Sequence, residues 1–170
     1  NRVAIEQALI DGSIDLGVII LSNSSHGADL EHHVLMRSRR QLWTAANHPV
    51  VENKDLSLED IAALPYIQIT VDEGEVSTDR YWQSKGITRN VAFRTSSMEA
   101  LRGLIAHGFG VTILSDMVYR PWSLEGKKIE ALPILDAIPP MEMGLLWRKG
   151  KSLDEANDAF REFLIYACGS

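Results

Sequence analysis

The chain has 170 residues, of which 45% are hydrophobic and 24% are charged, a composition close to the average of folded globular domains that excludes a disordered or low-complexity chain. A chain of this length buries enough surface for one sizeable core, or for two smaller cores that share a hinge. Its formal charge of −6 disfavours binding of this chain by itself to nucleic acid, because the phosphates would be repelled.

Cysteine content and apolar runs indicate the compartment. The only cysteine, Cys168, has no partner for an internal disulfide, so an oxidising environment would add no stability. No apolar run approaches the roughly 18 residues of a membrane span, and the first residues are neither basic nor apolar enough for a signal peptide. These features predict a cytoplasmic protein that does not contact a membrane.

The first part of the chain predicts a helix followed by a buried strand. Residues 3–9 have helical periodicity, and Asp11-Gly12 is a usual place for a helix to end. Residues 15–21 are almost uninterruptedly apolar, which is typical of a parallel strand buried on both faces. Strand-like residues return over 33–46 and are interrupted by the basic run Arg37-Ser38-Arg39-Arg40.

Helices and strands then alternate at short spacing. A helix is predicted over residues 58–64, with Ser57 as its N-cap and Asp60 three residues further on. The next predicted elements are a strand at 66–71, a helix at 78–84, a strand at 90–95, a helix at 97–107 and a strand at 111–114. This alternation predicts right-handed crossovers and a mostly parallel sheet.

A less regular stretch precedes a last strand, predicted at residues 143–147, and a last helix, predicted at 153–167. Two helices show capping-box spacing, Ser96 with Glu99 and Ser152 with Glu155. Apolar residues recur in the last helix at steps of three and four, which predicts that one of its faces belongs to the core. They are Ala156, Ala159, Phe160, Phe163, Leu164 and Ala167.

Most catalytic and metal-binding motifs are missing from the sequence. The histidines include no pair four residues apart, and no Cys-x-x-Cys occurs, so no metal is expected. Gly108-Phe109-Gly110 follows a predicted helix, the reverse of the order in a dinucleotide-binding turn, so no cofactor is expected. The acidic turn Asp72-Glu73-Gly74-Glu75 lacks the ligand spacing of a calcium loop and is interpreted as a solvated turn. No nucleophile elbow occurs either, and we expect no enzymatic activity.

Two polar segments remain as candidates for ligand binding. The run Arg37-Ser38-Arg39-Arg40 is either a solvated strand segment or the source of one guanidinium that reaches a ligand carboxylate. Thr95-Ser96-Ser97 carries hydroxyls where a strand is followed by a helix, and a helix N-terminus at the carboxyl ends of parallel strands favours an anion. An ordinary cap at Ser96 accounts for the same residues without a ligand, and both interpretations stay open.

Six segments, in this order, resemble the effector-binding domain of LysR-type transcription regulators. They are residues 9–18 (LIDGSIDLGV), 48–50 (HPV), 58–61 (LEDI), 65–67 (PYI), 97–111 (with SMEAL and LIAHGFGV) and 159–164 (AFREFL). Each segment is short, but together they extend over nearly the whole chain.

The resemblance implies an α/β fold of two Rossmann-like subdomains joined by a hinge of two crossing strands, like type II periplasmic solute-binding proteins. The first subdomain would comprise residues 1–41 and 142–170, N-terminally incomplete, and the second residues 42–141. A small-molecule effector would bind in the cleft between them. Carried over position by position, the implied effector-binding residues are Ile20, Ser22, Thr70, Val71, Ser96, Ser97, Gly108, Phe109 and Gly110.

The implied function is effector sensing in a bacterial transcription regulator. The hydroxyls of Ser22, Thr70 and Ser96 suit a small anionic or polar effector. Binding would favour one conformation and be signalled through a homodimer or homotetramer to DNA-binding heads. Antiparallel pairing, as in the family, makes the helix at residues 3–9 and the outer helices of the second subdomain the expected interface.

Family members begin with a winged helix-turn-helix, and their effector domain opens with a strand and a helix before the position that matches Asn1. We therefore expect these residues to come from a longer chain that contacts DNA only through that missing N-terminal domain. Two alternatives share the fold. A type II solute-binding protein of a transport system would have no DNA-binding head, and a small-molecule enzyme would need an acid, base or nucleophile in the cleft.

Overall fold

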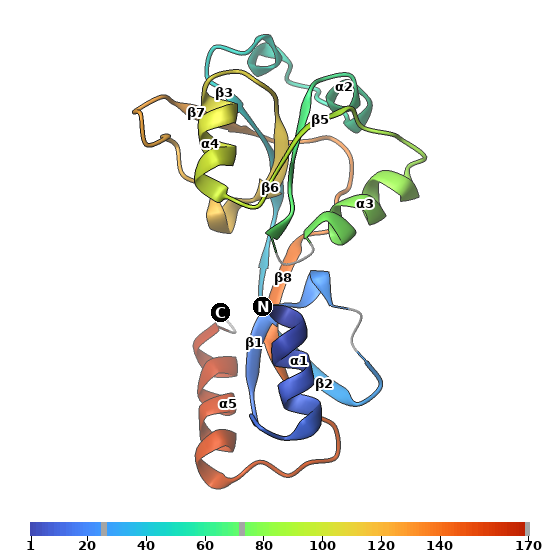
Figure 1. Ribbon diagram of the computed structural model, residues 1–170, viewed down its shortest axis with the longest axis vertical. Coiled ribbons are helices and arrows are strands. Elements are labelled where there is room, and N and C mark those ends of the chain that lie inside the picture. The colour runs from blue at the N-terminus through green and yellow to red at the C-terminus, as the bar shows by residue number, and fades with distance from the viewer. Residues whose placement is uncertain (25–26, 72–73, 169–170) are drawn as a thin grey trace. The chain divides into compact units, whose positions relative to one another are not determined.

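The structure is a computed structural model that describes residues 1–24, 27–71 and 74–168 (Figure 1). The chain divides into two compact units. Unit 1 comprises Asn1–Ser38 and Met141–Ser170, and unit 2 comprises Arg39–Pro140. The division inferred from the resemblance had placed the boundaries after residues 41 and 141.

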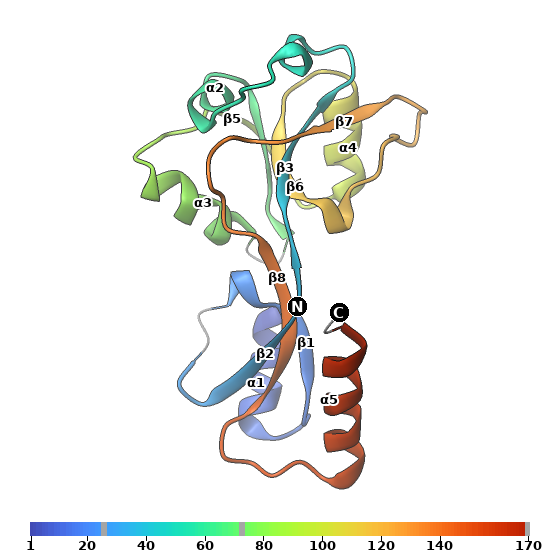
Figure 2. The same cartoon turned by 180° about the vertical axis from the view of Figure 1, so that it is seen from behind.

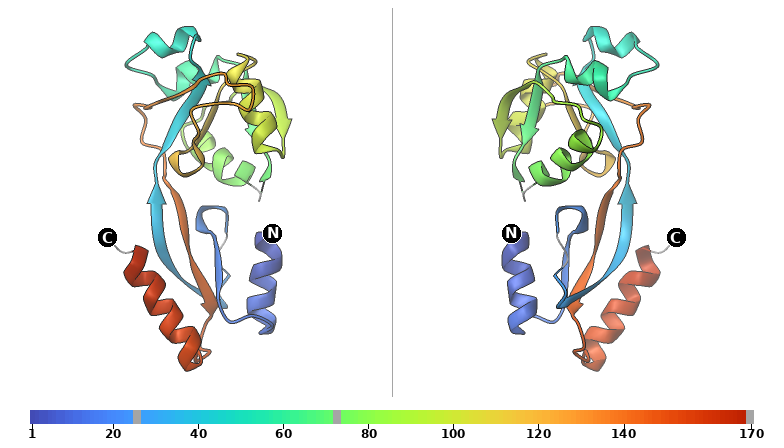
Figure 3. Two further views of the ribbon diagram at one scale, coloured as in Figure 1. Left: turned by 90° about the vertical axis from the view of Figure 1, so that its left-hand side faces the viewer. Right: turned by 90° about the vertical axis from the view of Figure 1, so that its right-hand side faces the viewer.

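Unit 1 is a three-stranded antiparallel sheet in the order β1-β8-β2, with α1 and α5 on opposite faces (Figure 3). Its elements are α1 (Arg2–Asp11), β1 (Gly17–Ile20), the 3-10 turn η1 (Leu21–Asn23), β2 (Leu30–Ser38), β8 (Met141–Arg148) and α5 (Glu155–Cys168). The core of the unit consists of Leu9, Ile19, Leu21, Leu30 and Leu146.

The predicted first helix and its end are confirmed by α1. Gly12 adopts the left-handed conformation with a φ of 82°, and its amide donates to the carbonyl of Ala8, which closes the last turn of the helix. Beyond this turn, α1 packs closely on β1. A Cβ atom at Gly17 would lie 2.6 Å from the Ile5 Cγ2 atom, so a side chain at this position would push the helix side chain away.

The prediction of a parallel strand buried on both faces is wrong for β1. This strand pairs with β8 in antiparallel register, and its burial alternates. Gly17 and Ile19 are buried, whereas Val18 is 46% exposed. An apolar run is therefore compatible with a strand that is buried on one face, because valine and isoleucine also favour strands through their branched side chains.

Unit 2 contains two sheets. Strand β3 lies between β6 and β7 in antiparallel pairing (Figure 2), and β4 pairs with β5 in parallel. A parallel bridge between Tyr66 and Val111 connects the two sheets. The elements are β3 (Arg40–Ala45), the 3-10 turn η2 (Pro49–Glu52), α2 (Leu58–Ala62), β4 (Tyr66–Ile69), α3 (Gly74–Ser84), β5 (Val91–Thr95), α4 (Met98–Ala106), β6 (Thr112–Ser115), the 3-10 turn η4 (Asp116–Val118) and β7 (Ile129–Leu132).

The prediction of a mostly parallel sheet is confirmed for the alternating strands from which it was made and is wrong for the other pairings. Among the described residues, only the β4–β5 pair and the Tyr66–Val111 bridge are parallel. Strands β3 and β8, where the chain enters and leaves unit 2, each pair with two strands in antiparallel register. Alternating helices and strands predict parallel pairing only for strands that follow one another through a helix, and β3 pairs with strands much later in the chain.

Two apolar clusters hold unit 2 together. One lies around Leu42, Tyr66 and Trp82, and the other around Trp43, Ile67 and Leu101. Neighbouring β3 residues thus contribute to different clusters, as expected when successive side chains of a strand point to opposite faces. The strand is consequently buried on both sides.

Helix caps are only partly as predicted. The capping box of Ser57 and Asp60 at α2 is confirmed. The box of Ser96 and Glu99 is wrong, because the Ser97 hydroxyl is the N-cap of α4 and accepts a hydrogen bond from the Ala100 amide (3.2 Å). In each helix the cap is the residue at which the backbone is extended directly before the first turn, and neighbouring polar residues make that position ambiguous in sequence.

Helix α5 departs from prediction at its start and on its predicted core face. The Asp154 Oδ1 atom accepts from the Asn157 amide (2.7 Å), so a cap at Ser152 with Glu155 is wrong. Phe160 and Phe163, expected in the core, are 52% and 61% exposed. The half-buried side of the helix consists of Asn157, Asp158, Arg161, Leu164, Ile165 and Cys168. The guanidinium of Arg161 lies over the Trp147 ring at 5.3 Å.

Candidate functional site

Two of the predicted binding segments meet at one edge of unit 2. Thr70 and Val71 follow β4, and Ser96 and Ser97 follow β5. Because these strands are parallel, their carboxyl ends lie at the same edge, and the Thr70 amide donates a hydrogen bond to the Thr95 carbonyl (3.0 Å). We call these five residues, Thr70, Val71, Thr95, Ser96 and Ser97, the hydroxyl edge.

The hydroxyls of the hydroxyl edge have different tasks. Ser97 caps α4, and the Thr95 Oγ1 atom accepts from the Ser97 amide (3.1 Å). Ser96 is exposed and directly precedes the cap. Since the N-terminus of α4 carries the positive end of the helix dipole, an anion beside Ser96 would meet a hydroxyl donor and a favourable field.

Gly108-Phe109-Gly110 does not join the hydroxyl edge. Gly108, with a φ of 78°, follows the C-terminal end of α4. Gly110 packs on the residue before β4, where a Cβ atom would lie 2.5 Å from the Pro65 carbonyl oxygen. These residues are therefore at the amino end of β4, whereas Thr70 and Val71 follow its carboxyl end, and the structure does not bring the two groups together.

The remaining predicted residues belong to unit 1. Ile20 is the last residue of β1, and the Ser22 hydroxyl in η1 accepts a hydrogen bond from the Glu142 amide (2.7 Å). This contact connects η1 to β8 and leaves Ser22 half-buried. A separate pocket of about 360 Å³ in this unit is lined by Ile10, Ala28, Asp29, Arg148 and Lys149, and none of the predicted residues lines it.

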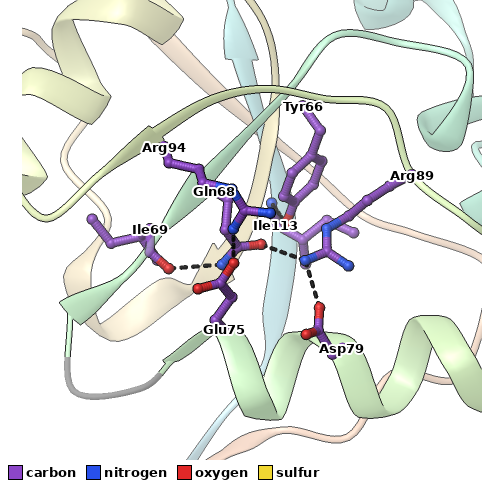
Figure 4. Close-up of polar contacts among 8 residues, drawn as sticks. All are labelled: Tyr66, Gln68, Ile69, Glu75, Asp79, Arg89, Arg94 and Ile113. Carbon is purple, nitrogen blue, oxygen red and sulfur yellow. Dashed lines mark hydrogen bonds and ion pairs between the residues drawn. The ribbon is translucent and has the colours of Figure 1, made fainter.

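A buried polar network next to the hydroxyl edge was missed by the sequence analysis (Figure 4). Gln68 of β4, 1% exposed, donates from Nε2 to the Ile69 carbonyl (2.7 Å). Its Oε1 atom accepts from Nη2 of Arg89 (2.7 Å), which also donates to Oδ1 of Asp79 on α3 (2.6 Å). The Arg89 guanidinium lies 5.4 Å from the Tyr66 ring centroid. The network thus attaches α3 to β4.

No local pattern in the sequence indicates this network, because its residues come from three separate segments of the chain. Their common feature is that each places a polar group against the same buried region. A glutamine inside an apolar strand, flanked by Ile67 and Ile69, is the one signal that was present, since a buried amide needs partners.

The acidic turn at residues 72–75 is only partly within the described residues. Asp72 and Glu73 lie outside the described residues, and Glu75 forms an ion pair with Arg94 of β5 (Figure 4). In the described ranges, no group of three or more His, Cys, Asp and Glu side chains is placed to hold a metal ion. No helix in this same part of the chain is long and apolar enough to cross a membrane.

Known regulators resemble the chain in sequence. The uncharacterized HTH-type transcriptional regulator YwbI of Bacillus subtilis is 21% identical over 166 residues, which cover 95% of this chain and 53% of that protein. The RuBisCO operon transcriptional regulator of Allochromatium vinosum is 22% identical over 97% of this chain and 54% of that protein. The chain thus spans about half the length of the curated relatives it matches.

The fold is that of known effector-binding domains. A putative LysR family transcriptional regulator from Pseudomonas aeruginosa, PA01, superposes with a TM-score of 0.85 and 22% identity over 100% of this chain and 59% of that chain. The effector binding domain of QuiR in complex with shikimate has a TM-score of 0.80 and 20% identity, over 98% of this chain and 77% of that chain. The predicted α/β fold of the type II periplasmic-binding-protein kind is confirmed.

The family follows from a match over almost the full length. The family model described as the LysR substrate binding domain matches residues 1–169. This range includes all of unit 2, all of unit 1 except Ser170, and every predicted binding residue. The chain therefore belongs to the family of LysR substrate binding domains.

Proposed function

We propose that this chain is the small-molecule effector-sensing domain of a LysR-type transcription regulator and has no catalytic activity of its own. Family membership supports this, as do relatives that are named transcriptional regulators rather than transport proteins. The longer protein would bind DNA through a domain outside this chain and work in the cytoplasm as a homodimer or homotetramer. Effector binding would favour one conformation and thereby alter DNA binding.

The hydroxyl edge carries the proposal for the binding site. In it, Thr70 and Ser96 stand at the carboxyl ends of adjacent parallel strands, where α/β proteins bind ligands. We assign Ser96 to the effector because Ser97, and not Ser96, caps α4. Ile20 and Ser22 remain proposed contacts from unit 1, whereas the glycine turn at residues 108–110 is at the other end of β4.

The test is a thermal-shift experiment with shikimate, benzoate, acetate, sulfate, phosphate and amino acids. We expect at least one of these compounds to raise the melting temperature of the chain, and Ser96→Ala to weaken the rise. Ser152→Ala, at another exposed serine, is the matched control and should leave the rise unchanged. Equal rises in the Ser96→Ala and wild-type chains would exclude the hydroxyl edge as the site, and no rise with any compound would contradict effector sensing by this chain.

A further inference from the structure

The basic run 37–40 separates into two kinds of arginine. Arg37 forms an ion pair with Glu142 (2.8 Å), and Arg39 forms one with Asp116 (2.5 Å); both guanidinium groups are largely exposed. Arg40, the first residue of β3, is half-buried. Arg40 belongs to unit 2, and its hydrogen-bond partners lie in the same unit.

Arg40 contacts neutral groups. Its Nη1 atom donates to the Pro139 carbonyl (3.0 Å), and its Nη2 atom donates to the Ser77 hydroxyl of α3 (3.3 Å). The guanidinium also lies over the Tyr81 ring, 5.6 Å from the centroid. Among the residues that the structure describes, no carboxylate forms an ion pair with Arg40.

Burial leaves this charge poorly solvated. Desolvation lowers the pKa of Arg40, and the nearby Tyr81 and Tyr66 act in the other direction. Burial also raises the pKa of Tyr81 well above its usual value, so the phenol stays neutral and cannot serve as the counter-ion. A guanidinium remains protonated under these conditions. It therefore carries a positive charge that has lost part of its water, and no carboxylate of the described residues pairs with it.

Helix α3 contacts both Arg40 and Arg94, the residue directly before the hydroxyl edge. Ser77 of this helix contacts Arg40. Glu75, two residues before Ser77, forms an ion pair with Arg94. Arg94 directly precedes Thr95 of the hydroxyl edge. Both sets of contacts thus involve the N-terminal half of α3, within unit 2. Planar guanidinium groups bind carboxylates through two parallel hydrogen bonds, and the aromatic ring below the guanidinium holds it in a fixed plane.

We propose that Arg40 is the charged contact for the carboxylate of an organic-acid ligand in unit 2, held in place by Tyr81, Ser77 and the Pro139 carbonyl. The inference rests on the proposed effector-sensing function and specifies its ligand class. Arg37 and Arg39 do not take part, because each already has a surface carboxylate partner. The carboxylate of the ligand pairs with the Arg40 guanidinium, and the other polar groups of the ligand face unit 2.

The experiment uses three acids and their uncharged counterparts on the chain: shikimate and methyl shikimate, benzoate and benzamide, acetate and acetamide. Dissociation constants are measured by calorimetry, and the side-chain Nε–Hε signal of Arg40 is followed by NMR; that signal is identified as the one missing in Arg40→Gln. At least one acid should bind, shift this signal and lose about tenfold or more in affinity in Arg40→Gln. Its uncharged counterpart should bind at least about tenfold more weakly to the wild type.

Two variants control for structure and charge. Arg39→Gln removes a neighbouring surface arginine and should bind the acid like the wild type, while Arg40→Lys keeps the charge and should fall between wild type and Arg40→Gln. If Arg40→Gln does not fold, Arg40→Lys and the wild-type NMR titration decide. Equal binding of acid and counterpart, or an unmoved Arg40 signal, would overturn the inference while leaving effector sensing intact. No binding by any compound of the wider panel would contradict both proposals.

Discussion

At the scale of single residues, we expect only one of two adjacent serines, Ser97, to contribute to stability. Ser97 supplies the acceptor for the Ala100 amide at the start of α4, whereas Ser96 is exposed directly before it. Ser97→Ala should therefore lower the free energy of unfolding by about 1 kcal/mol, the usual cost of losing an N-cap. Ser96→Ala should change it by less than about 0.5 kcal/mol. Urea unfolding of both variants measures the difference. A larger loss of unfolding free energy for Ser96→Ala than for Ser97→Ala would mean that Ser96 is the N-cap of α4.

His48 makes stability depend on pH. Its Nδ1 atom accepts a hydrogen bond from the Val50 amide (3.1 Å) at the start of η2, and burial lowers its pKa below 6.5. As the pH falls through about 6.5, the unfolded chain takes up the proton first, so the stability that neutral His48 contributes is lost below that pH.

His48→Asn tests this dependence, because asparagine also caps a helical turn but does not titrate. We expect the free energy of unfolding to fall less in this variant than in the wild type between about pH 7 and about pH 5. Urea unfolding at several pH values gives both curves. His107→Asn, at an exposed histidine of unit 2, serves as the control, and identical slopes for wild type and His48→Asn would show that His48 is not responsible.

At the scale of elements, glycines reveal how tightly neighbouring segments pack. A Cβ atom at Gly110 would lie 2.5 Å from the Pro65 carbonyl oxygen, whereas one at Gly103 of α4 meets nothing within 4 Å. Gly110→Ala must push β4 away and should cost about 1–3 kcal/mol. Gly103→Ala should stabilise the chain by roughly 0.5–1 kcal/mol, because alanine favours a helix interior. Melting temperatures that move in the same direction in both variants would contradict this packing.

Helices could be predicted better than strand pairing, for a physical reason. The capping box at α2 and the glycine that ends α1 depend on residues within one turn, and both are present as expected. The partners of β3 come from β6 and β7, far along the chain, and no local pattern specifies them. The same holds for the contact of Arg89 with Gln68 and Asp79. Of the hydroxyl edge, Thr95-Ser96-Ser97 was a candidate because it lies where a predicted strand is followed by a helix, whereas Thr70 and Val71 were implied only by the resemblance.

At the scale of the whole molecule, the units differ in how the chain builds them. Unit 2 is one continuous stretch, Arg39–Pro140, whereas unit 1 combines both ends of the chain. The resemblance had predicted a first subdomain built from both ends of the chain, because segments from all parts of the chain contributed to it. The burial of α5 was not predictable in the same way, since the stripe that contains Phe160 and Phe163 is apolar but largely exposed.

Unit 2 should consequently fold on its own. Both of its apolar clusters and all of its strand pairs lie within residues 39–140, and Trp43 and Trp82 are fully buried reporters of its core. We expect a fragment of residues 39–140 to unfold cooperatively in urea, with a slope of about 1 kcal/mol/M, as is usual for a small domain. The measurement is tryptophan fluorescence against urea concentration. Leu42→Asp in the same fragment, which places a charge in the core, should abolish the transition. A gradual change in the unmodified fragment would mean that unit 2 depends on unit 1 for its stability, although its hydrophobic clusters and strand pairs are internal.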